Sequence, residues 1–208
     1  MTNEVLPAPD SGHQRGPLDH EVRSQIMDAA NEYFRHYGYE KTTVSDLAKS
    51  IGFSKAYIYK FFDSKQAIGE AICRQCLEGL MTKVAAAVRH GDSASERLRN
   101  LFDTILSESL ALFFAERKLY DITAHAVTEK WAPPQEYQSK VRALLLQILK
   151  DGREQGEFER KTPLDEVSRA IYVAVEPFFN PVLLQYRMDD AEDTCRDVTG
   201  LILRSLAP

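Results

Sequence analysis

Apolar residues recur at intervals of three and four along almost the whole 208-residue chain, and no stretch alternates convincingly with a period of two. This spacing places apolar side chains on one face of an α-helix, whereas a half-buried strand requires alternation. Turn signals fall between stretches of helical length. The pattern therefore predicts an all-α fold of about nine helices, without internal repeats.

Residues that favour helix ends separate the predicted helices. Thr43 and Asp46 are spaced as a capping box, and Gly38 stands where a helix end favours a left-handed residue. Asp63 is the predicted start of the fourth helix, and Thr162 is the predicted cap of the eighth. The expected helices cover residues 19–37, 43–51, 55–61, about 25 residues from 63, 94–114, 117–130, 134–154, 163–186 and 190–206.

Composition divides the chain into three predicted parts. Residues 1–17 are rich in proline, glycine and polar residues without a period, which predicts a disordered arm. Residues 18–65 and 66–208 are predicted to form a small N-terminal domain and a larger C-terminal domain. The net charge is −5, yet residues 49–65 carry four lysines against one aspartate. Such a local basic patch can hold phosphates on an otherwise acidic protein.

The sequence also indicates the compartment. No apolar run reaches the roughly 18 residues of a membrane span, and the N-terminus lacks the apolar core of a signal peptide. The three cysteines, Cys73, Cys76 and Cys195, are too few for a disulfide framework. We therefore expect a cytoplasmic protein with no membrane partner. Cys73 and Cys76 form a C-x-x-C pair, for which a redox switch and ordinary packing are alternatives.

Two short predicted helices are joined by a tight turn at residues 52–54. This arrangement matches a helix-turn-helix, in which the first helix braces against the phosphate backbone and the second enters the major groove. Ile58 and Phe62 can face the core, so other side chains of the second helix remain for DNA. These side chains are Lys55, Tyr57, Tyr59 and Lys60. For Tyr57, a place in the core is an equal alternative.

The stretch around this motif, residues 33–68, resembles the TetR family of regulators, named for the tetracycline repressor. The family pattern has an aromatic residue and a glycine that end the first helix, and a Ser-Lys pair that opens a long apolar helix. The matching residues are Phe34, Gly38, Thr43, Val44, Leu47, Ala48, Gly52, Ser54, Tyr59, Phe62, Ser64 and Lys65. The remainder of the chain is similar only in its length and helical character.

The resemblance implies that the N-terminal domain binds double-stranded DNA. By position, Thr43 looks like a helix cap that also meets a phosphate, and Tyr59 like the family's phosphate-contacting tyrosine. Lys55, Tyr57 and Lys60 look like the recognition face, and Lys65 like the lysine at the start of the fourth helix. Tyr57 stands where a small Thr or Ser is more usual, and Phe61 where His or Tyr is frequent. The preferred base sequence therefore cannot be taken from a relative.

For the C-terminal half, the resemblance implies a homodimer formed by the last two helices, 163–186 and 190–206, and a pocket for a small-molecule effector. Pro177 could kink the first of these helices or mark a break in it. The candidate pocket residues, for each of which ordinary core packing is the more common role, are Phe102, Phe113, Tyr120, His125, Trp131, Tyr137, Tyr172, Glu176 and Phe179. Their composition suggests an aromatic or lipophilic ligand.

The leading hypothesis is therefore a repressor that a ligand releases from a palindromic operator, with no enzymatic activity, cofactor or metal. Two alternatives belong to other classes. Asp121, His125 and Glu129 fall on one face of a predicted helix and could present metal ligands in a helical metalloenzyme, although such a stripe is more often solvated. A DNA-binding scaffold whose C-terminal half binds a protein would instead have a filled, solid core.

Overall fold

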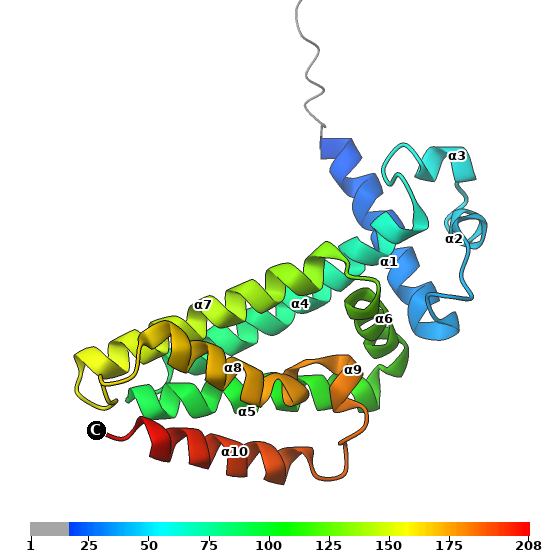
Figure 1. The fold of residues 1–208 in the computed structure, drawn as a ribbon. Helices are drawn as coiled ribbons and strands as arrows, with labels where there is room; N and C mark the ends of the chain where they lie inside the picture. The colour runs from blue at the N-terminus through cyan, green and yellow to red at the C-terminus, as the bar shows by residue number, and fades with distance from the viewer. Residues whose placement is uncertain (1–16) are drawn as a thin grey trace, which may run out of the picture.

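The computed structural model describes residues 17–208, and over this range the chain forms ten helices and no strand (Figure 1). The helices are α1 (Pro17–Tyr37), α2 (Val44–Ser50), α3 (Lys55–Ile58), α4 (Lys65–Arg89), α5 (Ala94–Ala115), α6 (Arg117–Thr128), α7 (Ala132–Glu154), α8 (Leu164–Phe179), α9 (Pro181–Leu184) and α10 (Ala191–Leu206). The all-α prediction is confirmed. The predicted arm, residues 1–17, lies outside the described residues except for Pro17, where α1 begins.

The tenth helix arises because the predicted helix 163–186 is broken. Helix α8 continues through Pro177 and ends at Phe179. Asn180 is extended, with φ −88° and ψ 114°, as a residue that precedes a proline prefers. Its side-chain Oδ1 then accepts a hydrogen bond from the backbone N–H of Val182 at 3.0 Å and caps α9. The break is therefore explained by Pro181 and not by Pro177.

At two other helices the predicted cap is wrong. Helix α4 is capped by Ser64, whose Oγ accepts from the backbone N–H of Ala67 at 3.0 Å, and not by Asp63. Helix α8 begins one residue later than expected, because Pro163 is itself extended and no side chain caps this end. The backbone N–H of Thr162 is bound instead by the Glu159 carboxylate at 3.1 Å.

The helices form two groups that share α4 (Figure 1). Helices α1, α2 and α3 gather at one end of the molecule, where α4 begins. Helix α4 then runs along the larger group, in contact with α5 and α7, while α8 and α10 complete this bundle. Helix α6 lies between the groups and contacts both α1 and α5. Within residues 17–208, no helix combines the length and apolar character needed to cross a membrane.

Each group has a hydrophobic core of its own. The core of the larger bundle is built from α4, α5, α7, α8 and α10. The core of the N-terminal group centres on fully buried Ile26, Phe34, Leu47 and Ile58. This second core also includes side chains from α4, from α6 and from the loop at Trp131. The N-terminal group is therefore held partly by the larger bundle, and the division at residue 65 stays a prediction.

Candidate functional site

Local hydrogen bonds hold the first helix of the motif. Thr43 caps α2, and its Oγ1 accepts from the backbone N–H of Asp46 at 3.2 Å. In return the Asp46 carboxylate accepts from the Thr43 backbone N–H at 3.1 Å and from the Thr43 hydroxyl at 2.6 Å. These bonds hold the pKa of the Asp46 carboxyl below its usual value. Thr43 is exposed, so its hydroxyl lies at the surface at the N-terminus of α2.

The second helix of the motif, α3, has only four residues and depends on its surroundings. Ser54 caps it by accepting from the backbone N–H of Tyr57 at 3.1 Å. Ile58 is fully buried and anchors the helix in the N-terminal core. Lys55 of α3 is exposed, as are Tyr59 and Lys60, which directly follow the helix. The ammonium group of Lys55 lies 5.7 Å from the centre of the Tyr59 ring, so these two predicted DNA-binding side chains share one surface.

Tyr57 combines the two alternatives raised by the sequence. Its ring is half-buried and lies edge-on between the rings of Phe53, at 5.0 Å, and Phe61, at 5.4 Å. The ammonium group of Lys60 lies 5.4 Å from the centre of the Tyr57 ring. The Tyr57 ring thus makes a cation–π contact with the exposed Lys60, and part of the ring remains at the surface.

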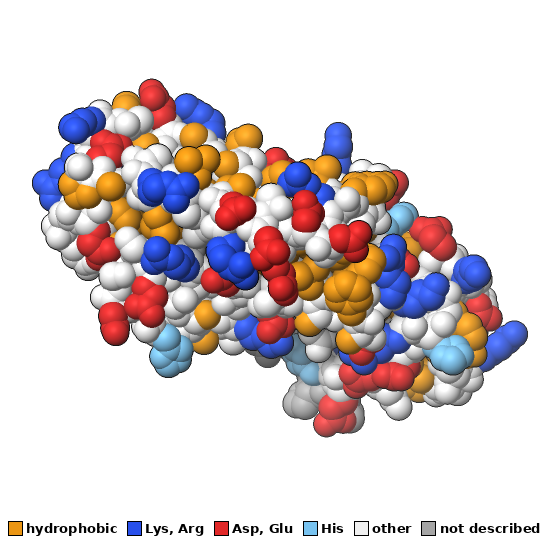
Figure 2. Space-filling model, turned by 90° about the horizontal axis from the view of Figure 1, so that it is seen from below, with side chains coloured by type: hydrophobic (Ala, Val, Ile, Leu, Met, Phe, Trp, Pro, Cys, Tyr) orange, Lys and Arg blue, Asp and Glu red, His pale blue; other side chains and the backbone are white. Residues whose placement is uncertain are grey.

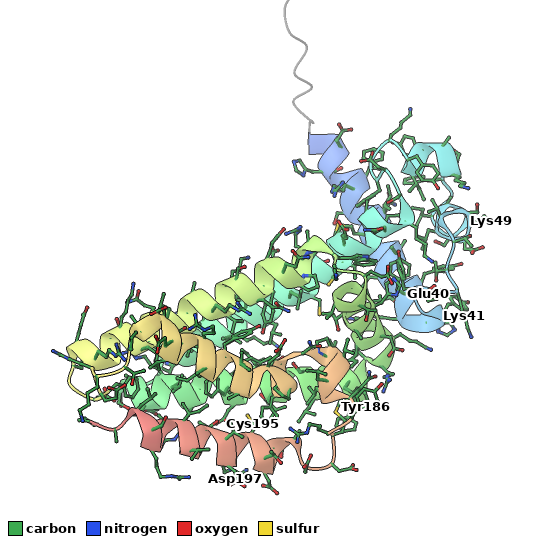
Figure 3. All side chains as sticks on the ribbon, viewed as in Figure 1. Glu40, Lys41, Lys49, Tyr186, Cys195 and Asp197 are labelled. Atoms are coloured by element: carbon green, nitrogen blue, oxygen red, sulfur yellow. The ribbon has the colours of Figure 1, made fainter. Side chains whose placement is uncertain are left out.

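Further basic side chains surround this surface. Figure 3 shows Lys41 and Lys49 projecting from the outer edge of the N-terminal group, and both are exposed. Lys41 lies two residues before the capping box at Thr43, so it is a phosphate-contact candidate that the motif comparison did not identify. Arg23 has a structural role: its guanidinium donates to the Phe61 carbonyl at 2.7 Å and lies 4.1 Å from the centre of the Phe62 ring.

Lys65 lies apart from the exposed lysines of α3. Its ammonium group is 4.2 Å from the centre of the Tyr39 ring and donates to the backbone carbonyl of Glu40 at 3.3 Å. Burial lowers the pKa of Lys65, against the opposing effect of the Glu40 carboxylate. Lys65 therefore ties the start of α4 to the turn between α1 and α2.

An aromatic joint continues from that turn into the larger bundle. We use this name for Tyr39, His125 and Trp131, whose ring centres lie 5.2–5.4 Å apart. The imidazole Nδ1 of His125 lies 3.2 Å from the Glu40 carboxylate. Gly69 of α4 makes room for the joint, because a Cβ there would lie 2.8 Å from both Trp131 and Tyr39. The joint connects α1, α4, α6 and the start of α7.

A mostly apolar cavity of about 290 Å³ lies within the larger bundle, lined by α4, α5, α6, α7 and α8 and by the start of α9. This volume is large enough for a small organic molecule. Of the predicted pocket residues, those that line it are Tyr120, Tyr137, Tyr172, Glu176 and Phe179.

The other four candidates lie elsewhere. Phe102 is fully buried and packs behind Phe179, with ring centres 5.7 Å apart. Phe113 packs against the Tyr120 ring at 4.9 Å. His125 and Trp131 belong to the aromatic joint described above. Sequence reasoning missed lining residues from α4, among them Cys76 and Leu80, because nothing in an apolar helix marks the face that borders a cavity.

Two phenols in the cavity wall differ in their hydrogen bonding. The Tyr120 hydroxyl donates to the backbone carbonyl of Pro181 at 2.7 Å and so ties α6 to α9. The Tyr137 hydroxyl is buried and has no hydrogen-bond partner within the described part of the chain. Burial raises the pKa of Tyr120 to about 12 and also raises the pKa of Tyr137. Both phenols are therefore protonated at neutral pH, and Tyr137 has a free donor.

Helices α4 and α6 each border both the N-terminal core and the cavity. In the N-terminal core, α4 contributes Ile68, Ile72 and Cys73, and α6 contributes Leu119, Ile122 and Ala126. In the cavity wall, α4 contributes Cys76, Leu77 and Leu80, and α6 contributes Tyr120, Thr123 and Val127. A molecule in the cavity would therefore touch the same two helices that support the DNA-binding motif.

The stripe of Asp121, His125 and Glu129 does not assemble into one site. Asp121 pairs with Arg117 at 2.8 Å, whereas His125 turns to Glu40. Over residues 17–208, no group of three His, Cys, Asp or Glu side chains is arranged to hold a metal ion.

Helices α8 and α10 expose apolar side chains. Val173 is 60% exposed and Leu201 is 62% exposed. Figure 2 shows the α10 side of the molecule, where hydrophobic side chains form patches among charged ones. In Figure 3, Cys195 points from α10 into the bundle and Asp197 points away from it. One side of each helix therefore packs inward while another remains uncovered.

Comparisons with known proteins agree with this architecture. The family described as bacterial regulatory proteins, tetR family, matches residues 26–72, and the tetracyclin repressor-like C-terminal domain matches residues 94–199. The HTH-type transcriptional repressor KstR2 of Rhodococcus jostii (strain RHA1) is 28% identical over 153 residues, 73% of this chain and 72% of that protein.

Two solved structures are similar in fold. The fatty acid degradation regulator FadR from Bacillus halodurans has a TM-score of 0.66 at 23% identity, over 91% of this chain and 96% of that one. The transcriptional regulator FadR from Bacillus subtilis in complex with stearoyl-CoA has a TM-score of 0.64 at 20% identity, over 88% and 98%. The family consists of DNA-binding transcription regulators, not enzymes. Because the C-terminal match alone spans about half of the chain, the protein belongs to the TetR family of bacterial transcription regulators.

Proposed function

We propose that the protein is a homodimeric repressor that binds a palindromic operator and is released from it by a small molecule in the cavity. The observation that carries the proposal is the double role of α4 and α6, which form one wall of the cavity and part of the core beneath the DNA-binding motif. The cavity also favours a ligand-binding regulator over a scaffold with a solid core.

For DNA binding, we propose that α3 lies in the major groove. Lys55, Tyr59 and Lys60 would meet base edges and phosphates, while Thr43 at the N-terminus of α2 would meet a phosphate. Tyr57 would contribute the exposed part of its ring. Lys65 would act chiefly by holding the start of α4, because its ammonium group already contacts Tyr39 and Glu40.

For dimerisation, we propose that α8 and α10 pack against the same helices of a second copy. Their uncovered apolar side chains, represented by Val173 and Leu201, would then be buried in an interface related by two-fold symmetry. Such a dimer presents two α3 helices to one face of DNA, and we expect them about 34–36 Å apart, one turn of the duplex.

For release, we propose that a ligand favours a position of α4 and α6 in which the two α3 helices no longer match this spacing. A lipophilic molecule suits the apolar walls of the cavity. One structural neighbour, FadR from Bacillus subtilis, was solved in complex with stearoyl-CoA. The aromatic joint would transmit the movement, because Trp131 lies between the cavity-lining start of α7 and Tyr39 of the N-terminal group.

The first test is selection of preferred sequences from random DNA by the full-length protein, followed by sedimentation of the complex. We expect a palindromic site bound by two subunits. A ligand that loosens this complex must itself bind the DNA-bound protein more weakly by the same factor, about 5–150-fold. Failure to enrich any sequence would contradict the regulator, and a one-sided effect of the ligand would contradict the release mechanism.

The dimer has a separate test. Replacing both Val173 and Leu201 with glutamate should convert the dimer to monomer in sedimentation equilibrium, because charges would be buried in the interface. Phe114→Glu is the control, since Phe114 is 71% exposed on α5 and lies outside the proposed interface. A control variant that dissociates while the double variant stays dimeric would move the interface away from α8 and α10.

A further inference from the structure

We propose that the cavity is a site for an organic cation, a lipophilic amine whose ammonium group is held by the Glu176 carboxylate. The inference rests on the proposed function only in taking this cavity as the effector site. It concerns the charge of the ligand, which neither the family nor the neighbouring structures determine for this chain.

The wall of the cavity carries more negative than positive side chains. Three charged side chains line it: Lys83, Glu108 and Glu176. Lys83 and Glu108 neutralise one another through an ion pair of 2.5 Å, and Lys83 is 61% exposed, which places this pair at the mouth. Glu176 is half-buried, and no cation within residues 17–208 forms an ion pair with it. The cavity thus contains one uncompensated negative charge.

Arg142 contacts Tyr172 of the cavity wall but does not itself line the cavity. Arg142 is exposed and stacks on the Tyr172 ring, with its guanidinium carbon 4.1 Å from the ring centre. It lines a second groove, between α7 and α8, together with Asp165 and Tyr172. A half-buried carboxylate in apolar surroundings is costly without a counter-ion, and a bound cation would remove that cost.

Aromatic side chains also line the cavity. Tyr120, Tyr137, Tyr172 and Phe179 contribute aromatic side chains to the wall of the same cavity as Glu176. The faces of aromatic rings attract ammonium groups, and desolvation inside a cavity strengthens that attraction. Rings around a carboxylate therefore suit an amine, whereas a carboxylate ligand would meet like charge at Glu176.

The Tyr137 hydroxyl is a second polar group of a cavity-lining residue, and it has no hydrogen-bond partner among the described residues. Its residue is only 9% exposed, it borders the cavity, and its oxygen has no partner in the described structure. A buried hydroxyl without a hydrogen bond is unfavourable, so a polar ligand group that reached it after a small shift of the ring would be stabilising. The ligand would thus carry an ammonium group for Glu176, and a polar group would reach Tyr137 only after that shift.

The experiment measures binding of three probes of similar size to the full-length protein by calorimetry without DNA: phenylbutylammonium, phenylbutanol and phenylbutyrate at neutral pH. We expect the ammonium to bind about tenfold more tightly than the alcohol, and the carboxylate to bind most weakly. In Glu176→Gln the ammonium should lose this advantage. In Glu176→Asp, which keeps the charge, part of it should remain.

Glu154→Gln is the matched control, because Glu154 is an exposed carboxylate near the end of α7, away from the cavity. It removes the same charge and should leave the order of the probes unchanged. Circular dichroism melts of all variants show that they are folded. The proposal is overturned if phenylbutyrate binds as tightly as the ammonium, if Glu176→Gln keeps the preference, or if no probe binds up to its solubility limit.

This outcome is separable from that of the repressor. A cation preference measured without DNA, in a protein that has no operator, would contradict the proposed function and leave the assignment of the cavity intact. An operator complex that is released by phenylbutyrate and not by the ammonium would support the repressor and overturn the cation site.

Discussion

The DNA-binding face and the cavity differ in where their functional side chains lie. At the DNA-binding face these side chains lie on the outside of the protein, and at the cavity they lie between helices. On α3, the candidate side chains point outward and are supported by Ile58, which is fully buried beneath them. In the larger bundle, Tyr137 and Glu176 point inward, and their usefulness depends on space left between helices. The DNA-binding face depends on the geometry of residues that are close in sequence. The cavity depends on space left between helices that are distant in sequence.

This difference affects how each region responds to substitution. A lysine on the outer face can be removed with little loss of stability, because it contacts mainly solvent and a ring edge. Removing a residue between the two regions should cost more stability, because the aromatic joint and α4 are packed from both sides. The predictions below use matched pairs of variants to separate affinity for DNA, stability of the joint and hydrogen bonding in the cavity.

The largest effect is expected for operator affinity. The double variant Lys55→Ala with Lys60→Ala should bind the selected operator about 100-fold more weakly, because two cationic contacts are lost. The dependence of log Kd on log salt should become shallower by about one for each lost phosphate contact. Fluorescence anisotropy across a salt series measures both quantities.

Lys150→Ala is the control for that experiment, since Lys150 is exposed on α7, far along the chain from the motif. Its operator affinity and probe binding should equal those of the wild type. If the double variant also lost affinity for phenylbutylammonium in the absence of DNA, the two surfaces would not be separate, and the contrast drawn above would fail.

Smaller effects, on the free energy of unfolding, are expected at two glycines of α4, and the two effects have opposite signs. Gly69→Ala should lower the free energy of unfolding by about 1–3 kcal/mol, because the new methyl group would lie 2.8 Å from atoms of Trp131 and Tyr39. Gly79→Ala should raise it by about 0.5–1 kcal/mol, because no neighbouring atom lies within 4 Å and alanine favours a helix. Denaturant unfolding measures both.

The intrinsic fluorescence of these variants adds a structural check, because Trp131 is the only tryptophan in the chain. Gly69→Ala should shift its emission, whereas Gly79→Ala should not. Equal stabilisation by both alanines would show that the aromatic joint does not pack against α4 as described.

The same contrast explains what could be predicted from the sequence. The helices and their DNA-side caps depend on neighbours within a few residues, so Thr43 and Ser54 could be recognised as caps from spacing alone. The sequence does not locate the break in the helix predicted at 163–186, because Pro177 and Pro181 can both disrupt a helix, and only the extended backbone of Asn180 distinguishes them. The predicted family and all-α fold are confirmed, because both depend on patterns of residues that are close in sequence.

The cavity could not be predicted in the same way. Tyr137 and Trp131 are aromatic residues six positions apart, yet one borders the cavity and the other fills the joint. Their difference comes from Tyr39 and Gly69, which are distant in sequence. Apolar side chains that line a cavity and those that fill a core have the same composition and spacing, so a list of candidates from sequence necessarily mixes both.

A third prediction compares two tyrosines of the cavity wall. Tyr120→Phe should cost about 1 kcal/mol of stability, because the Pro181 carbonyl loses its donor. Tyr137→Phe should be neutral or slightly stabilising, because it removes a buried hydroxyl that has no partner. Thermal unfolding of the two variants side by side tests the difference, and a loss in Tyr137→Phe equal to that in Tyr120→Phe would indicate an unrecognised partner for Tyr137.

The smallest effect concerns the capping box on the DNA side. Hydrogen bonds from Thr43 hold the pKa of Asp46 below its usual value, so the folded state favours the carboxylate. A lowered pKa stabilises the fold above the ordinary aspartate value of about 4, and this stabilisation is lost as the pH falls through the folded pKa. On acidification, the wild type should therefore lose more Tm than Asp46→Asn, by on the order of a degree. Asp63→Asn, also in the N-terminal group but more exposed to solvent than Asp46, should follow the wild type; if it instead behaves like Asp46→Asn, the acid sensitivity comes from general charge and not from the cap.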